Sequence, residues 1–222
     1  MTEQRWVPLE SNPDVLNKYI YNLGVPKEWQ FVDIYGLDQE LLAMVPRPVA
    51  AVVLLYPITD KVTANPLGEV KKSPDVFFVK QTISNACGTV AIVHTLANNK
   101  DKISFIDGKH FGKFLDSCLN LSPEERASFL ENDKDMGSAH EDTAQEGQTQ
   151  ASRDDVLKTH FVAFVCKDNS LYELNGRADG PVLHGITSPD TLLEDAAQVA
   201  KKFMARDPDE VNFTLMALSK VD

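Results

Sequence analysis

Apolar residues recur at helical spacing in several stretches of the chain, with polar residues between them. This pattern predicts helices over residues 13–23, 39–45, 111–119, 122–131 and 192–205. Asn12 is expected to cap the first helix and Gly24 to end it, while Ser122 begins a capping box. Residues 85–97 are apolar on nearly every face, which indicates a helix buried in the centre of the domain.

Strand patterns lie between these helices. One stretch alternates between apolar and polar residues, and another is a continuous β-branched apolar run, which is typical of a buried strand. Two later stretches predict a hairpin that turns at Asp168-Asn169. The predicted strands are residues 29–34, 49–56, 161–166, 170–174 and 211–219. Helices around a sheet of largely hairpin-joined strands indicate a single α/β or α+β domain over residues 1–222.

Two polar segments interrupt this pattern. Residues 59–75 contain two prolines and predict a surface loop. Residues 132–155 lack Val, Ile, Leu and aromatic residues, so we expect them to supply no core, although part of them can be helical. The end of this segment, from about residue 146, predicts a lid or binding loop. A domain linker is the alternative, but the chain that follows is too short for a second core.

Composition narrows the class of protein. The 222 residues carry 22 Lys and Arg against 33 Asp and Glu, a formal net charge of −11. This balance argues against nucleic acid or an anionic membrane as the main partner and suits a basic protein partner, although it can also serve solubility alone. The N-terminus lacks a signal peptide pattern, and no apolar run approaches the roughly 20 residues that span a bilayer. We therefore expect a cytoplasmic protein.

The three cysteines, Cys87, Cys118 and Cys166, form no Cys-x-x-Cys pair, so neither a zinc site nor a disulfide framework is predicted. Cys87 opens the buried helix, with Ser84 or Asn85 as a plausible cap. A helix N-terminus lowers a thiol pKa and favours the nucleophilic thiolate. A buried structural cysteine is the alternative.

Other residues can complete a thiol hydrolase. Gln81 precedes the Cys87 helix and can donate its amide to a developing oxyanion, together with the Cys87 backbone N–H, and Gly88 can let a substrate backbone approach. His160 opens a strand directly after the predicted lid and is the candidate base. His94 lies on the same helix as Cys87, roughly 10 Å along its axis, which is too far for direct proton transfer. The remaining histidines fall in predicted loops without companion residues, at positions 110, 140 and 184. A surface glutamine and an edge histidine are the plainer alternatives.

Asn175 follows the strand that pairs with the His160 strand. Its side-chain oxygen can accept the imidazole Nδ1–H and hold the ring, but it adds no charge to an imidazolium. As an alternative, Asn175-Gly176 is simply a turn dipeptide.

These residues belong to a longer series of motifs that resembles the small ubiquitin carboxyl-terminal hydrolases over nearly the whole chain. The matching stretches, in order, are residues 5–10, 44–48, 81–89, 97–100, 121–126, 146–149, 171–174 and 203–208. The resemblance implies a papain-like fold, with a central antiparallel sheet flanked by helices and a knotted backbone. It implies cleavage of small adducts or short peptides from the terminal glycine of ubiquitin, without a metal or cofactor.

The resemblance also implies roles for particular residues. Cys87 would be the nucleophile, His160 the base and Gln81 the oxyanion donor, and residues around 146–156 would form a crossover loop above the cleft. Ubiquitin, or ubiquitin-like modifiers, would be the partner of a monomeric enzyme. Residues that would contact this substrate are Pro8, Leu9, Asn85, Gly147 and Thr159.

One departure from the family pattern stands at Asn175, where the family usually has aspartate. Losing the corresponding charge in a serine protease costs roughly 10⁴ in turnover, but a thiolate–imidazolium pair should depend on it less. Asp179 could substitute only if the turn placed it near the ring. The alternatives to an active hydrolase are therefore a ubiquitin-binding protein with weakened hydrolysis and a general papain-like peptidase.

Overall fold

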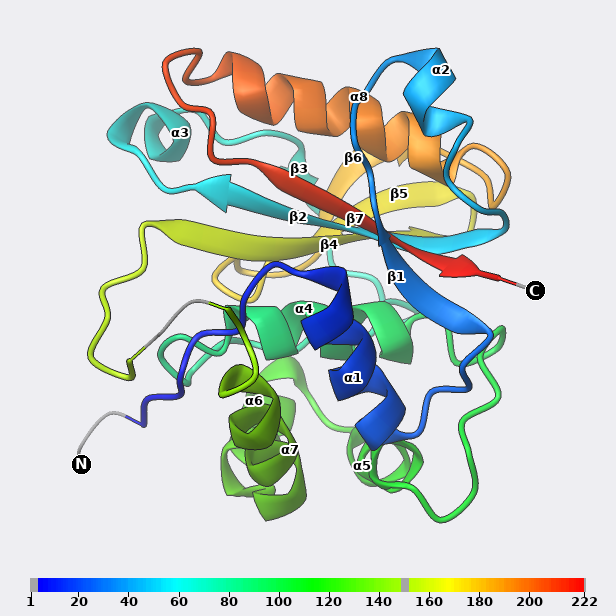
Figure 1. The fold of residues 1–222 in the computed structure, drawn as a ribbon, viewed down its shortest axis with the longest axis vertical. Coiled ribbons are helices and arrows are strands. Elements are labelled where there is room, and N and C mark those ends of the chain that lie inside the picture. The colour runs from blue at the N-terminus through cyan, green and yellow to red at the C-terminus, as the bar shows by residue number, and fades with distance from the viewer. Residues whose placement is uncertain (1–3, 149–151, 222) are drawn as a thin grey trace.

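The computed structural model describes residues 4–148 and 152–221. Within these residues, seven strands form one sheet in the order β1-β7-β2-β4-β5-β6-β3, and every pair is antiparallel (Figure 1). The strands are β1 (Trp29–Asp33), β2 (Val49–Pro57), β3 (Glu69–Val70), β4 (Thr159–Lys167), β5 (Ser170–Leu174), β6 (Val182–Ile186) and β7 (Thr214–Lys220).

Helices cover both faces of this sheet. They are α1 (Pro13–Leu23), α2 (Gln39–Leu42), α3 (Asp60–Ala64), α4 (Cys87–Ala97), α5 (His110–Cys118), α6 (Pro123–Asn132), α7 (Lys134–Ala144) and α8 (Leu192–Ala205). Helix α8 lies on one face with α2 and α3, while α1, α4, α5, α6 and α7 lie on the other (Figure 1). Across residues 4–148 and 152–221, no helix has the length and apolar character needed to cross a bilayer.

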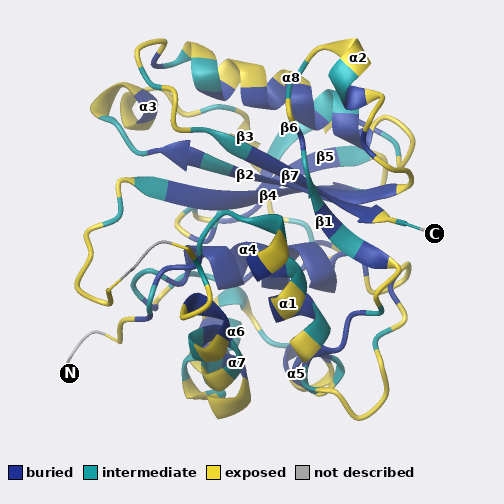
Figure 2. Cartoon of the chain, viewed as in Figure 1, coloured by how far each residue is buried: buried dark blue, intermediate teal, exposed yellow. Residues whose placement is uncertain are grey.

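The centre of the molecule is as apolar as the sequence predicts. All residues of α4 are buried, and β2 is buried along nearly its whole length because helices cover both of its faces (Figure 2). Burying a Val, Leu or Ile side chain contributes roughly 1.5–3 kcal/mol each, so this centre supplies much of the driving force for folding. The position of α4 against the sheet is therefore fixed by packing.

The predicted caps of α1 and α6 and the predicted β4–β5 turn are confirmed. Asn12 caps α1 by accepting a hydrogen bond from the Asp14 amide, and Gly24 ends the helix with a φ of +106°. Ser122 forms the expected capping box at α6. Asp168 and Asn169 both take left-handed conformations in the β4–β5 turn, as a two-residue hairpin requires.

Two predictions about polar segments are wrong. The segment 59–75 is more than a loop, because Thr59 caps the short helix α3 and residues 69–70 pair with β6 at the sheet edge. Helix α7 does supply core: Met136 and Ala144 are buried in the main cluster, because one face of this polar helix packs on α1 and the N-terminal segment. His140 and Thr143 of the same helix are buried as well.

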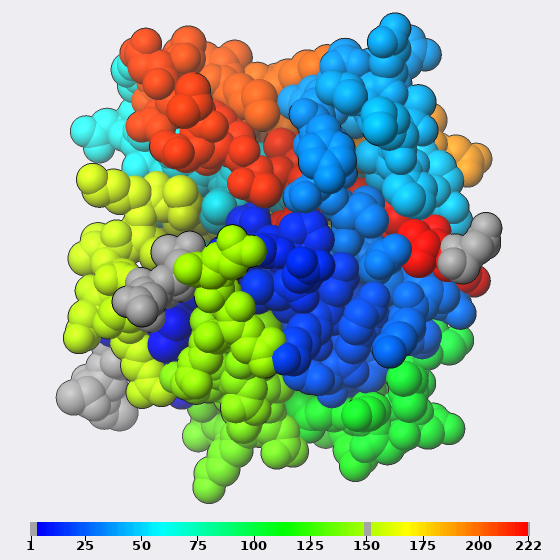
Figure 3. Space-filling model, in the orientation of Figure 1, coloured from blue at the N-terminus to red at the C-terminus, as the bar shows by residue number. Residues whose placement is uncertain are grey.

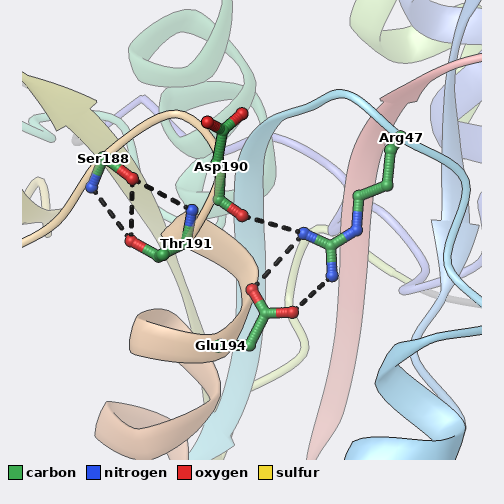
Figure 4. Close-up of polar contacts among 5 residues, drawn as sticks. All are labelled: Arg47, Ser188, Asp190, Thr191 and Glu194. Atoms are coloured by element: carbon green, nitrogen blue, oxygen red, sulfur yellow. Dashed lines mark hydrogen bonds and ion pairs between the residues drawn. The ribbon is translucent and has the colours of Figure 1, made fainter.

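Arg47 links the chain before β2 to the start of α8 through hydrogen bonds and an ion pair. Its guanidinium donates to the Asp190 carbonyl and to both carboxylate oxygens of Glu194, beside the hydrogen-bonded turn formed by Ser188 and Thr191 (Figure 4). The bidentate geometry orders the beginning of β2, the strand that carries neighbours of the candidate site at its other end.

Candidate active site

The buried helix α4 begins at Cys87, which places the thiol in the first turn as predicted. The cap is Ala86, which makes no side-chain capping bond, so the prediction of Ser84 or Asn85 as the cap is wrong. Asn85 takes a left-handed conformation with a φ of +65°, and this directs its side chain away from the helix. The first backbone N–H groups of α4 therefore have no side-chain cap and can serve an anion.

His160 and Asn175 are hydrogen-bonded across the β4–β5 hairpin. His160 Nε2 lies 2.8 Å from Asn175 Oδ1, which also accepts the Arg177 amide N–H at 3.0 Å. A carboxamide oxygen only accepts, so Nε2 carries the proton in the neutral ring and Nδ1 is the free base. The prediction that Asn175 holds His160 agrees with this arrangement, but the expected nitrogen, Nδ1, is wrong because the ring presents its other edge.

Gly176 brings this pair up to the helix that carries Cys87. A Cβ on Gly176 would lie 2.8 Å from both Gln81 Cβ and Val90 Cγ1, so no larger residue fits there. Gln81 N–H also donates to the Gly176 carbonyl at 2.9 Å. The Asn175-Gly176 turn thus holds three candidate groups around the start of α4.

The Cys87 thiol is buried, with the residue only 3% exposed. Desolvation by burial raises the pKa of the Cys87 thiol above its ordinary value, and it outweighs the Phe161 backbone and the charge of Arg177, which favour the thiolate. The predicted lowering of this pKa by the helix N-terminus is therefore wrong for this closed arrangement. With its pKa raised, the thiol is protonated at neutral pH.

His160 is equally enclosed, at 1% exposure. Burial first, and then the Arg177 charge, lower its pKa to about 4 against the opposing hydrogen bond to Asn175. Its Nδ1 has no hydrogen-bond partner among the described residues, so it is not yet bonded to the Cys87 sulfur. The resting site therefore pairs a neutral thiol with a neutral imidazole whose basic nitrogen is free.

Gln81 lies beside the start of α4. Its Nε2 donates to the Ile83 carbonyl at 3.2 Å, while its Oε1 is buried without a partner within the described residues. An amide nitrogen has a second hydrogen, which remains for an oxyanion.

A segment after α7 covers the site. Asn85 Nδ2 donates to the carbonyls of Arg153 and Asp155, at 3.2 and 3.3 Å, and Arg153 pairs with Glu141 of α7 at 2.8 Å. Val156 in this segment is 84% exposed, while the half-buried Leu157 packs against the main core. Residues 149–151 of the predicted crossover loop lie outside the described residues.

The N-terminal segment forms the other wall. Its backbone pairs with Ser84 just before Cys87, and Leu9 packs on Gly88, where a Cβ would lie 3.1 Å from Leu9 Cβ. Gly88 therefore makes room for Leu9, and the expectation that it admits a substrate backbone is wrong. Pro8 and Leu9 are both buried.

The same wall meets the start of the covering segment. Gly147 packs against Glu10, Lys18 pairs with Glu146, and the two stretches lie side by side on the surface (Figure 3). Thr159 is half-buried at the start of β4, paired with Pro57 of β2.

The other ionisable groups have structural partners. His94 is buried and accepts the Val79 amide N–H at 3.0 Å, and Asp179 extends into solvent toward Lys80, so neither completes the site. The expectation that the remaining histidines lie in loops without companion residues is wrong. His110 pairs with Asp133, His140 bonds Thr89 and Val7, and His184 pairs with Glu173. Within the described ranges, no group of His, Cys, Asp and Glu side chains could hold a metal ion.

Removing the Asn85 side chain should open the site. Asn85→Gly keeps the left-handed backbone and deletes two hydrogen bonds to the covering segment, so we expect Cys87 to react with iodoacetamide roughly five- to tenfold faster. Peptide mass spectrometry gives the rate for each cysteine. The buried Cys118 and Cys166 are internal controls, and an equal increase at all three would show general loosening instead.

Three buried histidines should make the fold sensitive to acid. Burial lowers the pKa of His94 to about 3 and those of His140 and His160 to about 4, from 6.5. The folded state stays neutral where the unfolded chain binds protons, so this stability is present above pH 6.5 and is lost as the pH falls toward 4. Each histidine contributes up to about 1.4 kcal/mol per pH unit. Urea unfolding at pH 5.5 should take up about three protons, and uptake near zero would contradict the assignment.

Comparisons with known proteins agree with this geometry. The sequence model of "Ubiquitin carboxyl-terminal hydrolase, family 1" matches residues 6–205. A ubiquitin carboxyl-terminal hydrolase from Aplysia californica is 62% identical over 94% of this chain and 99% of its own length. Human ubiquitin carboxyl-terminal hydrolase isozyme L1 is 44% identical over 96% of this chain and 97% of its own.

Solved structures include the UCH37 catalytic domain of Trichinella spiralis, bound to ubiquitin vinyl methyl ester. It superimposes with a TM-score of 0.81 at 26% identity and covers 100% of this chain and 98% of that one. The predicted papain-like class, an antiparallel sheet flanked by helices, is confirmed, while the knotted path stays a prediction. The chain belongs to family 1 of the ubiquitin carboxyl-terminal hydrolases.

Proposed function

We propose that this chain cleaves small adducts or short peptides from the C-terminal glycine of ubiquitin through an acyl-enzyme on Cys87. The observation that carries the proposal is the His160–Asn175 hydrogen bond, which leaves Nδ1 as a free base, together with the packing of Phe161 against Gly88, the residue after Cys87. His160 and Phe161 are consecutive residues, so nucleophile and base belong to one corner of the molecule.

The chemistry begins when the substrate displaces the covering segment. His160 Nδ1 takes the thiol proton as the sulfur attacks the glycine carbonyl, and the resulting imidazolium donates that proton to the leaving amine. A thioester on Cys87 remains. His160 then deprotonates a water molecule that attacks the thioester, and the protonated ring returns a proton to the leaving thiolate.

The oxyanion formed in both steps needs donors at the start of α4. The Cys87 backbone N–H is one, since it lies in the uncapped first turn, and the second hydrogen of Gln81 Nε2 is the other. Removing one such donor elsewhere costs about 10²–10³ in turnover, so Gln81 should matter mainly to kcat.

Ubiquitin is the substrate and partner in this proposal. A net charge of −11 suits a partner whose binding face is basic. Because Pro8 and Leu9 are buried, we propose that they shape the wall of the cleft, with the exposed Gln4 and Arg5 nearer to the substrate. Asn85, Gly147 and Thr159 flank the path of its tail. The proposal further assigns one catalytic domain to residues 1–222, acting as a cytoplasmic monomer.

The two alternative functions have less support. A ubiquitin-binding protein with weakened hydrolysis gains no support from relatives, which carry hydrolase names. A general papain-like peptidase would need an open cleft, whereas here a segment hydrogen-bonded to Asn85 lies beside the start of α4, and we propose that it restricts bulky substrates. Ubiquitin-specific hydrolysis is the remaining and preferred function.

Reaction with ubiquitin vinyl methyl ester tests the proposal directly. We expect a single covalent adduct at Cys87 in the unmodified chain and none in Cys87→Ala, because the probe needs the attacking sulfur. Intact mass spectrometry and peptide mapping locate the bond.

Cys118→Ala is the matched control, because it removes another buried thiol without touching the site. It should form the adduct at the original rate. Cys87→Ala should still bind ubiquitin by calorimetry while turnover of a ubiquitin C-terminal amide disappears. Adduct formation on another cysteine, or turnover surviving in Cys87→Ala, would refute the assignment.

A further inference from the structure

The stretch of chain that leads into Gln81, residues 76–80, lies outside the helices and strands. Its residues 76–79 are nevertheless buried. Buried backbone N–H and C=O groups need hydrogen-bond partners, and a stretch without a neighbouring strand must find them elsewhere. Side chains at the end of α4 and on α6 supply them here.

Asn98, the residue that ends α4, binds Phe77 as a neighbouring strand would. Its Oδ1 accepts the Phe77 N–H at 2.8 Å, and its Nδ2 donates to the Phe77 carbonyl at 2.9 Å. Nδ2 also donates to the His94 carbonyl, in the last turn of α4, at 2.8 Å. Because a backbone N–H can only donate, the orientation of the buried Asn98 carboxamide is fixed, and both of its ends are used.

Two further contacts continue this anchoring toward Gln81. Arg126 of α6 donates from Nη1 to the Phe78 carbonyl at 3.0 Å. The Val79 N–H donates to His94 Nε2, on α4, at 3.0 Å. Consecutive residues of the stretch are thus tied to two helices, and Gln81 follows only two positions later.

Helix α4 therefore determines the position of both proposed oxyanion donors. The Cys87 N–H lies in its first turn, and Asn98 at its other end holds the stretch that carries Gln81. All residues of this helix are buried, so it moves as one body with the core around it. A misplacement of about 1 Å in a reacting site can cost about 10² in rate, so the bonds of Asn98 bear on catalysis.

We propose that Asn98 is a positioning residue, which places the Gln81 amide for the oxyanion by binding the Phe77 backbone. The inference rests on the proposed function, in which Gln81 is an oxyanion donor. Asn98 does not touch the reacting atoms, because α4 separates it from Cys87 by roughly 16 Å along the helix axis.

The adjacent asparagine provides a matched control. Asn99 is also buried, but its Nδ2 donates to the Thr95 carbonyl at 2.9 Å and its Oδ1 accepts from Lys102 at 3.0 Å. A serine hydroxyl can donate to the carbonyl four residues before it. Asn98→Ser should therefore keep the bond to the His94 carbonyl and lose both bonds to Phe77, while Asn99→Ser leaves Phe77 bound.

Steady-state kinetics on a ubiquitin C-terminal amide test this role. We expect Asn98→Ser to lower kcat roughly tenfold with KM changed less than about twofold, and Asn99→Ser to change kcat less than about threefold. In the Gln81→Ala background, Asn98→Ser should change kcat less than about threefold, because the donor that it positions is gone.

Alkylation of Cys87 gives a readout that separates positioning from general damage. Iodoacetamide loses iodide directly to the sulfur and forms no oxyanion, so its rate does not depend on the Gln81 amide. Asn98→Ser should therefore be alkylated at Cys87 within about twofold of the original rate. If Asn98→Ser does not fold, Arg126→Lys, which weakens the bond to the Phe78 carbonyl from a half-buried position, should show the same coupling to Gln81.

Three results would overturn the inference: an unchanged kcat in Asn98→Ser, an equal loss of kcat with and without Gln81, or alkylation of Cys87 slowed as much as kcat. An active chain in which Asn98→Ser keeps its kcat refutes this inference alone. A chain that does not hydrolyse the ubiquitin amide at all refutes the proposed function as well.

Discussion

The packing of the fully buried helix α4 against the start of β4 is the contact on which the rest of the site depends. It sets Phe161 against Gly88, the residue after Cys87, and the close approach of Gly176 to Gln81 and Val90 brings the Asn175 turn to the same corner. None of these groups is positioned by an exposed loop. The N-terminal segment and the covering segment meet the site at Ser84 and Asn85, just before Cys87.

Burial on this scale explains the electrostatic state of the site. Desolvation disfavours both the thiolate and the imidazolium, so the resting centre is neutral and carries little charge for Asn175 to balance. A neutral third residue is therefore less costly here than in a site that rests as an ion pair. Its task is geometric: to hold the ring and to settle which nitrogen bears the proton.

The sequence was sufficient to predict the helices capped by Asn12 and Ser122, the buried helix α4, the buried strand β2 and the β4–β5 hairpin that brings Asn175 to His160. Each rests on a local signal, such as Asn12, Ser122 or the Asp168-Asn169 turn. Helix α7 was expected to supply no core because it has no β-branched or aromatic residue, yet Met136 is fully buried. Strand β6 went unpredicted because it shows no clear alternation: one of its residues is buried, two are half-buried and two are exposed.

Features that depend on long-range register were beyond sequence reasoning. Tyr56 belongs to an apolar run, and its position opposite His160 is known only once β2 is aligned with β4. The Cys87 pKa was predicted in the wrong direction because its position on the helix shows the dipole, while the burial that opposes it comes from distant segments. The choice of Nε2 at Asn175 likewise follows from how the strand presents the ring.

The crystal structure of the covalent adduct with ubiquitin vinyl methyl ester tests the central claim most directly, since it shows the site after the covering segment has moved. The account predicts a bond from Cys87 Sγ to the probe and His160 Nδ1 within hydrogen-bonding distance of that sulfur. It also predicts that His160 Nε2 remains on Asn175 Oδ1. A ring that stays away from the sulfur, or one that meets it through Nε2, would contradict the account.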